Sequence, residues 1–141
     1  MAVEGSAKRP AVRPQDVAGL LAQGTLSDLE RITATLDAAP WGPVARQVEQ
    51  VLDGAPPAGV ASMLRRAITR ARAEAERSER AEVAAEIAEL IAATGLTVAE
   101  VAARTGTSRS RLSTYRSGSV VPSAAYLVRL RRVAASLRTP P

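Results

Sequence analysis

The sequence predicts an all-α fold: an N-terminal helical unit joined by a long helix to a C-terminal helical domain. Aromatic residues make up only 2% of the 141-residue chain, whereas hydrophobic residues make up 46%. A core of Ala, Val, Leu and Ile favours close-packed helices over sheets, whose strands favour β-branched and aromatic residues. Apolar residues also recur at helical spacing between residues that typically begin or end helices.

The N-terminal part divides into a polar arm and a helical unit. Residues 1–13 are small, charged and Pro-containing, which is typical of a disordered arm. Residues 14–71 carry helical patterns separated by Gly and Pro, and we expect a unit that dimerises or binds another protein or effector. Within it, Ser27 and Glu30 match a capping box. We expect Trp41 to anchor the core of this unit, the alternative being an interface hot spot.

A long helix is expected to follow. Its apolar stripe thins to alanines between residues 72 and 82, where charged residues pair at helical spacing, and a strong apolar face resumes at residue 83. Nothing in residues 72–82 breaks a helix, so we expect a continuous helical connector. The alternative is two helices with a hinge near Ser78.

Residues 83–138 contain two short helices joined by a tight turn. Thr97 begins a capping box of the form T-x-x-E, and Gly106 ends the resulting helix about two turns later. Ser108 is expected to cap the next helix, which covers residues 109–117. Two short helices with a Gly-bearing turn between them predict a helix-turn-helix.

The distribution of charge indicates a polyanion as the partner. The chain has 19 basic and 14 acidic residues, a net charge of +5. Residues 1–59 carry 5 basic and 7 acidic residues, whereas residues 60–141 carry 14 basic and 7 acidic residues. The last part, residues 101–141, holds 8 arginines and no acid. An acid-free basic end is typical of proteins that bind nucleic acid.

The stretch GLTVAEVAARTGTSRSRLSTYRSGSVVPSAAYLVRLRRVA resembles the Cro/C1-type (XRE) family of helix-turn-helix proteins, over residues 83–137. The landmarks that match at the spacings of that family are Gly95, Thr97, Ala102, Gly106, Ser108, Leu112, Gly118 and Pro122. The resemblance implies a transcriptional regulator that binds double-stranded DNA, most simply a homodimeric repressor. Val98 departs from the family, because many members carry there a Gln that contacts phosphate. Thr105 and Thr107 replace usually aliphatic residues and make the core of the turn polar.

A helix that begins after Ser108 would enter the major groove with its N-terminus first. By analogy with the family, the base contacts are Arg109, Ser110 and Thr114. Among these, Arg109 is expected to make a bidentate contact with guanine. The expected phosphate contacts are Arg104, Arg111, Ser113, Arg116, Ser117 and Ser119. The alternative for the arginines is an ordinary solvated basic face.

Other function classes lack the residues that they need. The chain has no Cys and no His, so Cys-ligated zinc and Ser-His-Asp chemistry are excluded, and we expect no enzyme, metal or cofactor. No apolar run approaches the roughly 18 residues of a membrane span, and the N-terminus carries no signal-like segment. We therefore expect a cytoplasmic, nucleoid-associated protein without membrane contact. Two alternatives remain: an antitoxin whose N-terminal unit binds a toxin, and a phage or plasmid immunity or copy-control repressor.

Overall fold

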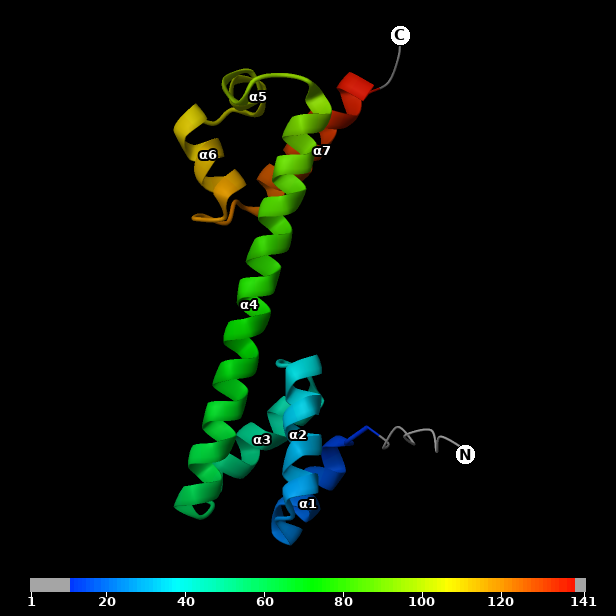
Figure 1. Cartoon of the computed structure of the whole chain (residues 1–141), viewed down its shortest axis with the longest axis vertical. Helices are drawn as coiled ribbons and strands as arrows, with labels where there is room; N and C mark the ends of the chain where they lie inside the picture. Colours follow the sequence, from blue (N-terminus) through cyan, green and yellow to red (C-terminus); the bar gives the residue numbers. More distant parts are fainter. Residues whose placement is uncertain (1–10, 139–141) are drawn as a thin grey trace, which may run out of the picture. The chain divides into compact units, whose positions relative to one another are not determined.

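The computed structural model describes residues 11–138, which form seven α-helices, one short 3-10 helix and no strand (Figure 1). The predicted all-α fold is therefore confirmed. The chain divides into two compact units, the first ending at Ala75 and the second beginning at Glu76. Each unit encloses its own cluster of buried hydrophobic residues.

The first unit is a small helical bundle. Its elements are η1 (Pro14–Asp16), α1 (Val17–Gln23), α2 (Leu26–Ala38), α3 (Pro43–Asp53) and the first part of α4 (Ala58–Thr94). Helix α1 packs against both α2 and α3, as Figure 1 shows. The largest fully buried side chains are Val17, Ile32, Leu36, Val48 and Leu64. Each helix thus contributes one apolar stripe to a shared core, and burial of these stripes holds the unit together.

Two residues of the first unit differ from the sequence prediction. Residues 1–10 of the predicted disordered arm lie outside the described residues, but Val12 of the same arm is buried at 6% exposure in the core of the unit. Trp41 is 46% exposed, so the expectation that it anchors the core is wrong. It lies in the Pro-bounded turn between α2 and α3, and the buried Val44 and Ala45 that follow the turn face the core instead.

The start of α2 also differs from the prediction. The hydroxyl of Thr25 accepts a hydrogen bond from the backbone N–H of Asp28 at 3.1 Å, and the helix begins at Leu26. Ser27 therefore lies inside the first turn and does not cap the helix. Thr25 and Asp28 form an equally good T-x-x-D signal two residues earlier in the chain, and the backbone adopts that one.

Helix α4 is continuous from Ala58 to Thr94, which confirms the predicted long helix and leaves no hinge at Ser78. No residue between 72 and 82 is buried. This segment therefore keeps its helical form without a core of its own, and i,i+4 contacts such as the one between Ser78 and Glu82 support it.

The second unit consists of the last part of α4 with α5 (Val98–Thr105), α6 (Arg109–Ser117) and α7 (Ala124–Arg138). Helix α5 packs against both α6 and α7 (Figure 1). The buried residues that these helices share are Ile87, Ile91, Val101, Ala102, Leu112, Tyr126 and Leu130. Among residues 11–138, no helix is long and apolar enough to cross a membrane.

Candidate nucleic-acid interface

The predicted capping box at the start of α5 is present. The Thr97 hydroxyl accepts from the backbone N–H of Glu100 at 3.2 Å, and the Glu100 carboxylate accepts from the backbone N–H of Thr97 at 2.7 Å. That backbone hydrogen bond holds the pKa of Glu100 below its ordinary value. At the other end, Gly106 has a φ of +74°, and its N–H donates to Ala102 as α5 ends. The helix therefore begins and ends where the sequence predicts.

A buried pair of hydroxyl groups joins the C-terminal end of α5 to α7. Thr105 is 0% exposed, and its hydroxyl donates to the carbonyl of Val101 at 2.8 Å. The Tyr126 hydroxyl of α7 lies 2.7 Å from the same oxygen. Because the only hydroxyl hydrogen of Thr105 is already used, Tyr126 must be the donor of this second bond. Burial raises the pKa of Tyr126 above its ordinary value.

Two arginines of α7 contact other helices of the second unit. Arg129 donates to the backbone carbonyl of Thr105 at 3.1 Å, where it satisfies the C-terminal end of α5 and opposes the negative end of the helix dipole. Arg131 lies 2.6 Å from the carboxylate of Glu86 on α4, and this contact holds the pKa of Glu86 below its ordinary value. Sequence reasoning assigned neither partner, since the contacts span 24 and 45 positions along the chain.

Helix α6 is fixed at its start and on its inner face. The Ser108 hydroxyl accepts from the backbone N–H of Arg111 at 3.0 Å, as predicted for the N-cap. Leu112 is fully buried among residues of α4, α5 and α7. These two contacts set which face of α6 is directed away from the core.

The outward face of α6 forms one shallow hollow. Its lining residues are Arg109, Ser110, Ser113, Thr114 and Ser117. The structure thus brings the three predicted base-contact residues together with two of the predicted phosphate contacts. The hollow has no acidic lining residue, which is the arrangement that a negatively charged ligand requires.

The other predicted phosphate contacts lie around this hollow or on the neighbouring helix. Arg111 and Arg116 are exposed residues of α6, and Arg104 is exposed in the last turn of α5. Within residues 11–138, no ion pair engages Arg109, Arg111 or Arg116. Their positive charges are therefore not neutralised by carboxylates of the same chain.

Three hydroxyl groups of this surface are already hydrogen-bonded inside the chain. Thr114 donates to the carbonyl of Arg111 at 2.6 Å, and Ser117 donates to the carbonyl of Thr114 at 3.1 Å. Ser119 lies 2.7 Å from the Ser117 hydroxyl and must be the donor of that bond. A phosphate oxygen only accepts hydrogen bonds, so Ser117 and Ser119 would have to give up these bonds to contact phosphate. Thr114 keeps lone pairs with which it can accept from a base.

Comparison with known proteins agrees with this geometry. A family model described as a helix-turn-helix domain matches residues 63–137, more than half of the chain. No curated protein and no solved structure matches the chain. The chain therefore belongs to the helix-turn-helix domain family, and this membership indicates a DNA-binding regulator.

Proposed function

We propose that this protein is a sequence-specific transcriptional regulator of the Cro/C1 type, acting as a homodimeric repressor that reads the DNA major groove with α6. The observation that carries the proposal is the hollow on α6, which Arg109, Ser110 and Thr114 line together while Leu112 is buried in the core. An α-helix fits the major groove, and a face without acidic residues suits the negatively charged DNA.

Each residue has a distinct role in this proposal. Arg109, near the N-terminus of α6, binds the O6 and N7 of a guanine with two hydrogen bonds. Ser110 contacts a neighbouring base, and Thr114 accepts from a base amino group. The set that binds phosphate is Arg104, Arg111, Ser113 and Arg116. Ser119 joins once its hydrogen bond to Ser117 opens, and Ser117 joins once its hydrogen bond to the Thr114 carbonyl opens.

A dimer follows from the size of the interface. A single module buries roughly 600–1,000 Å² on DNA, which is small for tight specific binding. Two copies on a palindrome would double the contacts, with half-sites about 34–36 Å apart. We place the dimer contact in the first unit, and the protein in the cytoplasm with the nucleoid. The proposal assigns no catalytic role, since a chain without His and Cys lacks the commonest catalytic residues.

The antitoxin alternative is less well supported. A toxin-binding segment of an antitoxin typically folds only when it binds its toxin. The first unit instead has its own core, in which Ile32, Leu36 and Val48 are at most 1% exposed. A small adjacent toxin gene that is regulated together with this gene would favour the antitoxin. A phage or plasmid repressor would use the same chemistry and differ only in the genes around it.

The test is DNA selection with the full-length protein at about 150 mM salt, where purely electrostatic binding is weakened. We expect enrichment of a palindrome. Arg109→Ala should lose discrimination at one position of each half-site, at a cost of about 1–3 kcal/mol. Arg111→Ala should weaken binding to all sequences and reduce the salt slope by about one. Failure to enrich any motif, or wild-type behaviour of both variants, would refute the assignment of α6 as the recognition helix.

A further inference from the structure

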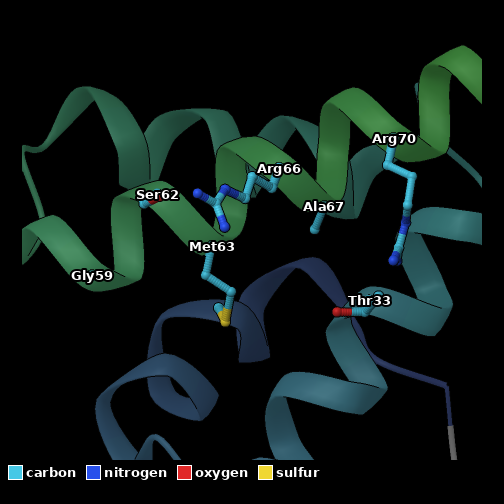
Figure 2. Close-up of a pocket in the computed structure, with 7 residues that line it drawn as sticks. All are labelled: Thr33, Gly59, Ser62, Met63, Arg66, Ala67 and Arg70. Carbon is cyan, nitrogen blue, oxygen red and sulfur yellow. The ribbon is translucent and has the colours of Figure 1, made fainter.

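The first unit contains a second open site, formed by residues of α2 and α4 (Figure 2). It is a pocket of about 640 Å³, which lies within the roughly 300–1,000 Å³ of small-molecule sites. All its lining residues lie before Ala75, so the site belongs to the first unit alone. No residue of the proposed DNA-binding surface takes part in it.

Two arginines give the pocket its charge. Arg66 and Arg70 are four residues apart on α4 and therefore share one face of the helix. Figure 2 shows their side chains extending from neighbouring turns, with Arg70 directed toward α2. The Asp37 carboxylate lies 3.8 Å from Arg70, and both side chains of that pair are more than half exposed. Such an exposed pair is weak, so it leaves Arg70 available to a ligand.

Arg66 is the less engaged of the two arginines. Among residues 11–138, no hydrogen bond or ion pair involves its guanidinium group. The pocket is lined by two arginines and by no acidic residue, and the first acidic residue of α4 is Glu74, four positions after Arg70. The pocket therefore carries an excess of positive charge. Arginine side chains bind carboxylate and phosphate groups in bidentate geometry.

The remaining lining residues add neutral contacts. Met63 is partly buried and Ala67 is buried, so together they form an apolar floor. The Ser62 hydroxyl can donate to a ligand. The Thr33 hydroxyl already donates to the carbonyl of Leu29 at 3.0 Å and can only accept. At Gly59 a side chain would meet no atom within 4 Å, so the pocket is open at this end.

We propose that this pocket binds a small organic anion, with a carboxylate or phosphate group at Arg66 and Arg70 and a short apolar body over Met63 and Ala67. The concave shape and the apolar floor favour a small molecule over a DNA backbone, whose phosphates offer no apolar group to such a floor. The site does not depend on the proposed DNA-binding function. If both hold, the anion is a ligand of the regulator that binds in its first unit.

The test is calorimetry on the full-length protein with three probes: inorganic phosphate, phenyl phosphate and benzoate. We expect phenyl phosphate to bind more tightly than inorganic phosphate, because only the former covers the apolar floor. Arg66→Gln and Arg70→Gln should each weaken phenyl phosphate binding about tenfold or more, the usual effect of losing a charge-assisted hydrogen bond. Benzoate separates the two anion classes, since stronger binding of benzoate would identify a carboxylate site.

Two further variants separate a pocket from general attraction to a basic surface. Arg65→Gln removes the same charge from the adjacent, exposed position of α4 outside the pocket, and should change binding less than twofold. Gly59→Leu extends a side chain into the open end without a change of charge, and should weaken phenyl phosphate more than inorganic phosphate.

The proposal is overturned if none of the three probes binds at about 10 mM, a concentration roughly tenfold above the upper end of typical enzyme KM values. It is equally overturned if Arg65→Gln weakens binding as much as Arg66→Gln, which would indicate nonspecific attraction. Displacement of phenyl phosphate by duplex DNA in the Arg109→Ala variant would assign the pocket to DNA instead. None of these outcomes affects the selection of DNA by α6, so the two proposals fail independently.

Discussion

The buried hydroxyl pair between Thr105 and Tyr126 allows the polar core of the turn to be tested by a double-mutant cycle. Thr105→Val keeps the shape of the side chain but removes the oxygen that accepts the hydrogen bond of the Tyr126 hydroxyl. Tyr126 is only 6% exposed. A buried donor left without its acceptor costs about 1–3 kcal/mol. Tyr126→Phe removes the donor instead. Thr105 still donates to Val101 in that variant, so the loss should be about 0.5–1.5 kcal/mol.

The double variant distinguishes a real interaction from two separate losses. With both hydroxyls replaced by apolar groups, no donor remains stranded, so its cost should lie below the sum of the single variants by about 1 kcal/mol. For a unit of this size, 1 kcal/mol corresponds to a shift in Tm of about 4–8 °C. Thermal unfolding of the full-length variants, followed by circular dichroism at 222 nm, has the resolution to measure these differences.

Thr107→Val is the matched control for this cycle. Thr107 lies in the same turn and is only partly buried, and among the described residues its hydroxyl makes no hydrogen bond. The substitution should therefore change the free energy of unfolding by less than about 0.5 kcal/mol. If Thr105→Val were as mild as Thr107→Val, or if the double variant lost the full sum, the two hydroxyls would not be coupled and the reasoning would be refuted.

Three further measurements test other contacts of the second unit. The pKa of Tyr126 in the folded protein is raised above its ordinary value of 10.0. Its contribution to the free energy of unfolding should therefore be fully present below pH 10 and be lost as the pH rises through the folded pKa. Urea titrations at several pH values should show this loss in the wild type and not in Tyr126→Phe. Thr97→Ala should cost about 1 kcal/mol by removing the N-cap of α5, and chemical denaturation near neutral pH measures it. Arg129→Met should lower Tm, because the carbonyl of Thr105 loses its hydrogen-bond partner. Arg132 is exposed, and Arg132→Met should leave Tm unchanged in the same thermal scans. Equal shifts in Tm would contradict a stabilising contact between Arg129 and Thr105.

Local features of the fold could be predicted because their causes lie within a few residues. The caps at Thr97 and Ser108 depend on a partner three positions away, and the end of α5 depends on a single glycine. The same reasoning placed the start of α2 wrongly. Thr25 and Ser27 each begin an acceptable cap, and residue spacing alone does not rank two overlapping signals.

Features set by distant residues could not be predicted in this way. Trp41 was expected in the core because it is large and apolar, but the turn between α2 and α3 leaves it 46% exposed. Arg129 contacts a carbonyl 24 positions away, and no periodicity indicates such a partner. For the candidate site, analogy with the helix-turn-helix family named Arg109, Ser110 and Thr114, and the structure brings these three residues together in one hollow. The hydrogen bond between Ser117 and Ser119 was not predicted. A serine in the sequence shows that a donor and an acceptor are present, but it does not show which partner they find in the fold.

The structure shows which arginines of the basic C-terminal part are engaged in contacts within the chain. Residues 101–141 carry 8 arginines, but Arg129 and Arg131 are engaged within the second unit, one with a carbonyl and one with a carboxylate. The ion pair of Arg131 would have to break before its guanidinium group could neutralise a phosphate, whereas Arg129 keeps its charge and its other N–H donors. Arg109, Arg111 and Arg116, in contrast, have no ion pair among the described residues and all lie on α6. The salt dependence of DNA binding grows with the number of phosphates neutralised, so it should reflect the arginines that contact phosphate and not the total charge. On α6 such arginines lie beside the predicted base contacts, which is why the outward face of α6 carries the functional argument better than the basic composition does.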